Sequence, residues 1–184
     1  MRVRLSESTV TWRTTLRAMR RDRDAAVRVI EADLRKRAHR AAFLRVFDAY
    51  VRDPMEGGKP LAPSVRRSLA ARLRAHPTTH VFLAFDGDSA IGMCVCFAGF
   101  STFAARPLMN IHDIGVLPGL RGHGIGGRMI AAVAAKARKL GCCKLTLEVR
   151  RDNRRARGLY RKAGFAQVTV ERGRVPVEFW ERPL

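Results

Sequence analysis

Glycines gather where a strand-like run meets a long apolar helix, in the stretch LPGLRGHGIGGRM at residues 117–129. The stretch holds five glycines and two arginines. Successive glycines let the backbone approach a ligand closely and let several N–H groups turn towards one point. The N-terminus of the following helix adds N–H groups that lack intrahelical partners and the positive end of its dipole. The spacing therefore predicts a binding site for a pyrophosphate group.

Two common phosphate-binding motifs do not fit these glycines. The P-loop requires a Lys followed by Ser or Thr after its last glycine, and no such pair follows here. The dinucleotide fingerprint is G-x-G-x-x-G, whereas the chain has G-x-G-x-G-G from residue 122 to residue 127. The remaining pattern is Arg121-x-x-Gly124-x-Gly126.

A second motif follows on the next predicted helix. It reads N-x-x-A-x-x-x-Y-x-K-x-G-F, from Asn153 to Phe165. Asn153 and Tyr160 are two helical turns apart, so they share one face of that helix. With the "V-x-P" that precedes Arg121, the two motifs resemble the GNAT superfamily, the Gcn5-related N-acetyltransferases, and in particular bacterial members of unassigned substrate. The resemblance is good over residues 80–170 and thin over residues 25–75.

The resemblance implies a donor substrate, acetyl-CoA, held between two splayed strands at residues 107–117 and 143–149. The backbone of the first strand would pair with the pantetheine arm, backbone N–H groups of the glycine loop would hold the pyrophosphate, and the next helix would supply further contacts. The implied binding residues are Ile114 and Val116 on the strand; Arg121, Gly122, His123, Gly124, Ile125 and Gly126 in the loop; and Asn153 at the start of the helix. The basic stretch at residues 150–162 lies beside this cleft, so Arg154, Arg155 or Arg157 is expected to contact the 3′-phosphate of coenzyme A, and we include Arg157 in the site.

The implied reaction is direct attack of a primary amine on the thioester. Tyr160 would act as general acid and protonate the departing thiolate. The amine must also lose a proton, and the candidate acceptors are His112, Asp113 and Glu148. We favour Asp113, followed by Glu148. Because His112 and Asp113 are adjacent on a strand, they should point to opposite faces, and Gly115 is expected to mark a bulge.

The elements that must position these residues follow from hydrophobic periodicity and turn residues. The order of the elements predicts an α/β (mixed α+β) fold with one predominant sheet. The resemblance implies the GNAT fold, with a single, mostly antiparallel central sheet and helices on both faces. The expected strands cover residues 25–34, 80–85, 90–100, 107–117 and 142–149, with a final pair at the C-terminus. The expected helices cover residues 38–52, 64–75, 126–141 and 152–164.

Net charge and the spacing of the cysteines narrow the possible functions further. Lys and Arg number 36 against 16 Asp and Glu, which gives a net charge of +20. The basic residues are dispersed, so we place a nucleic-acid-binding protein behind an acetyltransferase and behind a domain that senses acetyl-CoA without turnover. The four cysteines lack zinc-ligand spacing, so no metal is expected.

The chain is expected to form one acetyltransferase domain, residues 23–184, behind a basic leader, residues 1–22. No apolar run is long enough to span a bilayer, and the start lacks the apolar core of a secretory signal. We therefore expect a cytoplasmic protein with acetyl-CoA and an amine as its partners, without a membrane or a specific nucleic acid. An exposed final strand pair would permit a homodimer.

Overall fold

The computed structural model describes residues 27–166. The expected leader, the exact start of the domain and the final pair of strands lie outside the described residues. Within them, each expected helix and strand is present, with bounds that differ by a few residues from the expectation.

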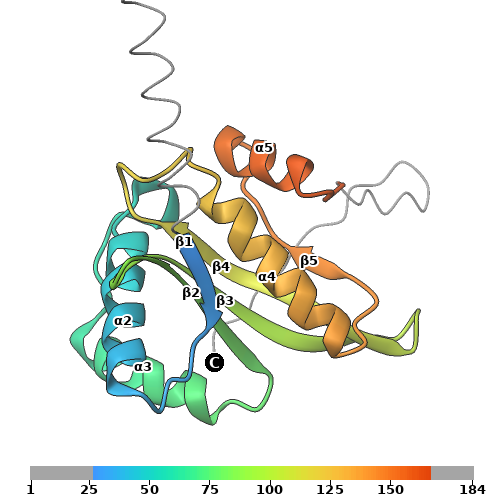
Figure 1. Cartoon of the computed structure of the whole chain (residues 1–184), viewed down its shortest axis with the longest axis horizontal. Coiled ribbons are helices and arrows are strands. Elements are labelled where there is room, and N and C mark those ends of the chain that lie inside the picture. Colours follow the sequence, from blue (N-terminus) through green and yellow to red (C-terminus); the bar gives the residue numbers. More distant parts are fainter. Residues whose placement is uncertain (1–26, 167–184) are drawn as a thin grey trace, which may run out of the picture.

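A five-stranded sheet forms the centre of the described chain (Figure 1). Its strand order follows the sequence, and only the last pair, β4 with β5, is parallel. A parallel pair requires a crossover connection, which α4 (Ile125–Lys139) supplies here. The strands are β1 (Val27–Glu31), β2 (Thr79–Asp86), β3 (Ser89–Ser101), β4 (Arg106–Val116) and β5 (Leu145–Leu147).

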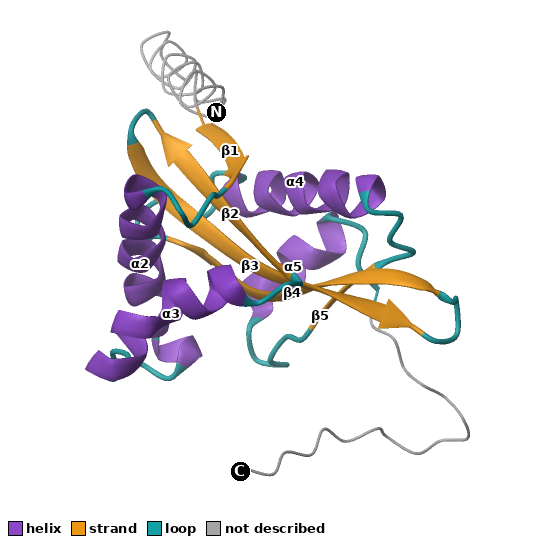
Figure 2. Cartoon of the chain, turned by 90° about the horizontal axis from the view of Figure 1, so that it is seen from below, coloured by secondary structure: helices purple, strands orange, loops and turns teal. Residues whose placement is uncertain are grey.

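Helices cover both faces of this sheet (Figure 2). Central strand β2 is apolar on both sides: Leu83 packs into the core beneath α2 (Arg37–Val51) and α3 (Pro63–Ala75), and Phe82 into the core beneath α4 and α5 (Arg154–Lys162). A continuous apolar run is typical of a strand covered on both faces. The expected architecture is confirmed.

A bulge in β4 changes where two candidate residues point. Val95 pairs with Asp113, and the next residue of β3, Cys96, pairs with Ile111, so His112 is the extra residue of a β-bulge. The expectation that His112 and Asp113 point to opposite faces is therefore wrong. Asp113 lies opposite Val95 on the α2 face, and the His112 ring is 5.4 Å from Phe97 on that same face.

Gly115 does not mark this bulge. It leaves room for the ring of Tyr50 on α2: a Cβ at this position would lie 2.8 Å from Tyr50 Cδ2. The glycine is therefore required by close packing between the strand and α2.

Strands β4 and β5 pair over only three residues, Met109 to Ile111 with Leu145 to Leu147. Residues 112–116 of β4 continue beyond the bulge and pair with β3, but they have no partner in β5. One edge of β4 is thus left without a strand partner among the described residues. The expected separation of these two strands begins at the bulge.

Candidate active site

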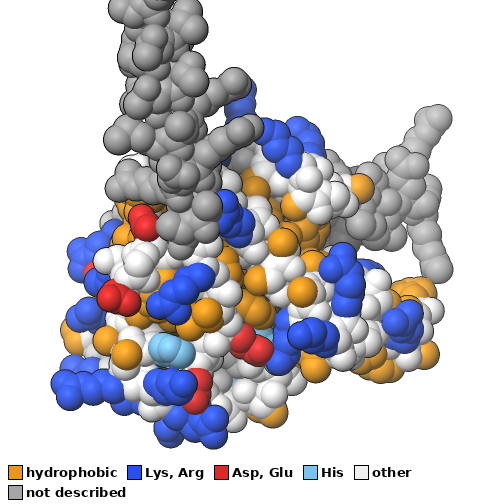
Figure 3. Space-filling view, in the orientation of Figure 1, with side chains coloured by type: hydrophobic (Ala, Val, Ile, Leu, Met, Phe, Trp, Pro, Cys, Tyr) orange, Lys and Arg blue, Asp and Glu red, His pale blue; other side chains and the backbone are white. Residues whose placement is uncertain are grey.

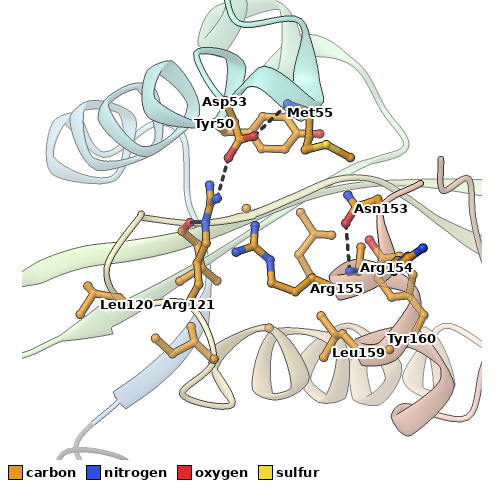
Figure 4. Close-up of a pocket in the computed structure, with 18 of the residues that line it drawn as sticks. Tyr50, Asp53, Met55, Leu120, Arg121, Asn153, Arg154, Arg155, Leu159 and Tyr160 are labelled. Carbon is orange, nitrogen blue, oxygen red and sulfur yellow. Dashed lines mark hydrogen bonds and ion pairs between the residues drawn. The ribbon is translucent and has the colours of Figure 1, made fainter. Parts of the chain in front are cut away.

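A cavity of about 500 Å³ lies where β4 and β5 part. We call its two sides the loop wall, which comprises residues 114–116, 120–122 and 124–126 together with Asn153 and α5, and the η1 wall, residues 50–56 at the end of α2 and in the short 3₁₀-helix η1 (Pro54–Glu56). Figure 4 shows the labelled side chains of the two walls facing each other across this space. The two walls come from distant parts of the sequence.

The loop wall presents backbone donors to the cavity. Gly122 and Gly124 have φ values of +86° and +75°, in the left-handed region that glycine adopts without strain. The backbone N–H groups of Arg121, Gly122 and residues 124–127 donate to no acceptor among the described residues. Gly124 is also the N-cap of α4 and has no side-chain cap. The wall therefore offers a row of free donors at a helix N-terminus, which suits an anion.

Glycines 126 and 127 differ from each other in their packing. A Cβ on Gly126 would lie 2.8 Å from Leu159 Cδ2, whereas one on Gly127 would meet the same side chain at 3.9 Å. Gly126 therefore lets α5 pack against the first turn of α4, besides lining the cavity.

The side chain of Arg121 joins the two walls. Its Nε donates to the carbonyl oxygen of Val116 at 2.8 Å, and its Nη1 lies 2.6 Å from Asp53 Oδ2 (Figure 4). Asp53 in turn caps η1 by accepting from the Met55 N–H at 2.9 Å. The Met55 N–H and the Arg121 guanidinium hold the pKa of the Asp53 carboxyl below its ordinary value. Sequence reasoning missed Asp53, although an Asp directly before Pro is a typical helix-start pattern.

Helix α5 brings Asn153 and Tyr160 to the cavity, as the two-turn spacing predicts. Asn153 Oδ1 accepts from the Ala156 N–H at 3.1 Å, so this side chain is the N-cap of α5. Tyr160 is 8% exposed and packs edge-on against Phe165. Burial, with a smaller effect from nearby negative charge, raises the pKa of Tyr160 to about 12. Its hydroxyl therefore keeps its proton at neutral pH.

The η1 wall presents a carboxylate that the sequence did not single out. The Tyr50 hydroxyl donates to Glu56 Oε2 at 3.0 Å, and both residues line the cavity. Asp113 lies against the same phenol on the α2 face and does not line the cavity. Burial raises the pKa of Asp113, and its neighbours His112 and Tyr50 oppose that shift only in part.

Two other expected site residues lie outside the cavity. Glu148 is exposed, with its carboxylate oxygens 3.4 Å and 3.5 Å from Asn110 Nδ2. Arg157 Nη1 donates to the carbonyl oxygen of Arg151, whereas Arg154 and Arg155 line the cavity.

The remaining expected residues mostly lie on the loop wall. Nδ1 of His123 is 3.3 Å from the Leu120 carbonyl oxygen, and His123 does not line the cavity. The structure brings together the other expected cofactor-binding residues, Ile114, Val116, Arg121, Gly122, Gly124, Ile125, Gly126 and Asn153. Their roles stay predictions.

Within residues 27–166, no three His, Cys, Asp or Glu side chains gather as a metal ion requires. No described helix is long and apolar enough to cross a membrane.

The acetyltransferase (GNAT) family matches residues 43–165, well over half of the chain. The chain therefore belongs to this family. An uncharacterized N-acetyltransferase of Bacillus subtilis, YhfO, is 32% identical over 101 residues, which are 55% of this chain and 67% of that protein. The N-alpha-acetyltransferase RimI of Mycobacterium tuberculosis is 36% identical over 100 residues, 53% of this chain and 59% of that protein. These matches thus span about three fifths to two thirds of each relative.

Solved structures show the same fold. An aminoglycoside acetyltransferase from an uncultured soil metagenomic sample, in complex with trehalose, has a TM-score of 0.71 at 17% identity, covering 88% of this chain and 99% of that one. AAC(6')-Iy in complex with a CoA bisubstrate analogue has a TM-score of 0.66 at 17% identity, covering 86% of this chain and 99% of that one. The family and fold predictions are confirmed.

Proposed function

We propose that this chain transfers an acetyl group from acetyl-CoA to a primary amine. The observation that carries the proposal is the cavity itself. It has a row of free backbone N–H groups on one side and the protonated Tyr160 hydroxyl group on α5. The first feature suits a pyrophosphate, and the second suits a leaving group that needs a proton.

The loop wall can contact acetyl-CoA from its pantetheine arm to its phosphates. The free edge of β4 at Ile114 and Val116 can pair with the amides of a pantetheine arm, as an added strand would. The N–H groups of residues 121–126 then meet the pyrophosphate. Arg154 and Arg155 line the same cavity and supply positive charge for the phosphates. Arg157, which was expected to share this task, stays a weaker candidate because it lies outside.

Acetyl-CoA supplies a thioester whose sulfur leaves as a thiolate. Tyr160 donates its hydroxyl proton to that sulfur as the carbon–sulfur bond breaks, and its raised pKa means that the hydroxyl is protonated when acetyl-CoA binds. Its burial against Phe165 fixes the ring, so the hydroxyl is oriented before the reaction.

Relatives with named activities support the transfer to an amine. RimI of M. tuberculosis is an N-alpha-acetyltransferase, and one structural neighbour is an aminoglycoside acetyltransferase. No comparison supports the two alternatives, a sensor of acetyl-CoA and a nucleic-acid-binding protein. Figure 3 shows Lys and Arg spread over the visible face of the molecule.

We extend the proposal to the whole chain, with an acetyltransferase domain at residues 23–184 behind a basic leader at residues 1–22. We propose that the enzyme acts in the cytoplasm, needs no metal and can form a homodimer. Size-exclusion chromatography with light scattering tests the last point, and metal analysis of the purified protein tests the absence of a metal.

The test is release of free thiol from acetyl-CoA across a panel of primary amines. Tyr160→Phe should lower kcat by about 100-fold, the usual size of a general-acid effect, with an unchanged Kd for acetyl-CoA. Unchanged turnover would contradict the acid role of Tyr160. Binding of acetyl-CoA by the wild type without thiol release would favour the sensor, and tight salt-sensitive DNA binding would favour the third function.

A further inference from the structure

Two carboxylates line the cavity within the described part of the chain, and they are engaged to different degrees. Asp53 accepts from the Met55 N–H and pairs with Arg121. Glu56 accepts one hydrogen bond, from Tyr50 at 3.0 Å, and its side chain is exposed to the cavity. Glu56 is thus the more exposed and the less engaged of the two carboxylates, and within residues 27–166 its charge is not paired with an Arg or Lys in an ion pair as that of Asp53 is.

We propose that Glu56 binds the ammonium group of the acceptor and takes the proton that frees its nitrogen for attack. The inference rests on the proposed function, since it names the proton acceptor of that reaction. Glu56 on η1 and Tyr160 on α5 line the same cavity from its two walls. A thioester near the Tyr160 hydroxyl therefore has Glu56 on its other side, where the acceptor must enter.

The other candidate carboxylates are less well placed. Asp113 lies beside the Tyr50 hydroxyl on the α2 face of the sheet and, unlike Glu56, does not line the cavity. Glu148 is exposed beside Asn110, outside the cavity.

Glu56 is held in place from two directions. The Tyr50 hydroxyl fixes its carboxylate, and the Tyr50 ring is itself fixed against Gly115 of β4. The Asp53–Arg121 ion pair ties the start of η1 to the glycine loop. Tyr50 and Asp53 are thus positioning residues, and the loop that faces the donor also sets the place of the proton acceptor.

Glu56 takes one proton from the ammonium group, and the freed nitrogen forms a bond to the thioester carbon. The carbon–sulfur bond breaks, and the sulfur leaves with its electron pair and takes the Tyr160 proton. The nitrogen then passes its surplus proton through water to the Tyr160 oxygen. Glu56 releases its proton to water, so one proton is released for each ammonium acetylated.

Several charged and titratable groups face Glu56. Tyr50 on α2, Asp113 on β4, Tyr160 on α5 and Arg150 before α5 all interact with it electrostatically. Asp53, Arg121, Arg154, Arg155 and Lys162 share the cavity. The same groups surround residue 56 in the wild type and in a variant of this residue. The effect of Glu56 is therefore measured as the difference between the pH profile of that variant and that of the wild type, because the contributions of the other groups cancel in that difference.

The test compares Glu56→Gln with Asp88→Asn, a matched carboxylate-to-amide change at an exposed site in the β2–β3 turn. Glu56→Gln should lower kcat/KM for the amine by about 100-fold near neutral pH, as loss of a general base does, with an unchanged Kd for acetyl-CoA. The loss should shrink as the pH approaches the pKa of the free amine, because the acceptor then arrives deprotonated. Asp88→Asn should match the wild type.

Tyr50→Phe separates catalysis from positioning. It removes the hydrogen bond but leaves the carboxylate, so kcat/KM should fall by about tenfold while the wild-type pH profile is retained. Near-normal kcat/KM in Glu56→Gln would overturn the proposal, as would an equal loss of acetyl-CoA binding or the same pH-dependent loss in Asp113→Asn or Glu148→Gln. Absence of thiol release by the wild type would instead overturn the proposed function itself.

Discussion

The two walls of the cavity are built from different kinds of groups. The loop wall offers mainly backbone N–H groups from one continuous stretch that begins at a strand and ends in a helix. The η1 wall offers side chains, Tyr50 and Glu56, which are set by contacts with β4 and with the loop. Binding through the backbone requires a local sequence pattern, whereas a group of side chains requires distant segments to meet.

Changing a loop-wall glycine should have the largest effect. Gly124 and Gly119 have nearly equal φ values, +75° and +77°, and a Cβ on either meets no atom within 4 Å. Only Gly124 lines the cavity. Gly124→Ala should weaken acetyl-CoA binding about 10- to 100-fold by displacing the phosphate from the N–H groups, measured by calorimetry.

Gly119→Ala is the matched control, because it introduces the same backbone strain of about 1–2 kcal/mol. Its melting temperature should fall as in Gly124→Ala, with normal acetyl-CoA affinity. Equal losses of affinity in both variants would show that strain, and not the phosphate site, explains the effect.

The ion pair between Arg121 and Asp53 should make the effects of changes in the two walls depend on each other. We expect Arg121→Ala and Asp53→Asn each to lower kcat/KM for the amine about fivefold, because either change frees η1 from the loop. The double variant should lose little more than either single one, with a coupling of about 1 kcal/mol. A double-mutant cycle of kcat/KM measures this coupling, and additive losses would mean that the walls act independently.

Displacing Tyr50 on the η1 wall should leave acetyl-CoA binding by the glycine loop unchanged. Gly115→Ala places a Cβ 2.8 Å from Tyr50 Cδ2, so the ring must shift, at a cost of about 1–3 kcal/mol in unfolding free energy. The KM for the amine should rise several-fold, and the Kd for acetyl-CoA should stay the same. Gly99→Ala, which meets only the flexible end of Leu108 at 3.3 Å, is the control. An equal rise in KM in both variants would contradict this assignment.

The smallest effect is expected for Asp113, whose carboxyl group lies beside the Tyr50 hydroxyl. The pKa of Asp113 is raised above its ordinary value of 3.8, so the folded chain favours the protonated form. That stabilisation is present at low pH and is lost as the pH rises through the raised pKa. Asp113→Asn keeps a neutral side chain, so its melting temperature relative to wild type should be higher at about pH 7 than at about pH 4. A pH-independent difference would contradict the raised pKa.

Much of the fold could be predicted from the sequence. The order of the elements and their approximate bounds follow from periodicity and turn residues, because each helix or strand buries a face that its own residues encode. The grouping of Asn153 and Tyr160 on the cavity side of α5 follows from helical spacing alone.

The bulge in β4 could not be predicted in this way. Its position depends on the register between β3 and β4, and the strand sequences fit several registers equally well. The expected proton acceptors, His112, Asp113 and Glu148, do not include a residue of the η1 wall, and that choice stays a prediction. Glu56 lies in a Pro- and Gly-rich loop with no local pattern that marks it, and it reaches the cavity only because α2 packs against β4 at Gly115.

The sequence by itself determined the family and the loop wall, because that wall depends on glycine conformations and helix termini, which are local properties of the chain. The tertiary structure alone decided the η1 wall, the face on which Asp113 lies and the link from Arg121 to Asp53. Those features depend on strand register and on how two distant segments pack, and neither is encoded within a single stretch of residues.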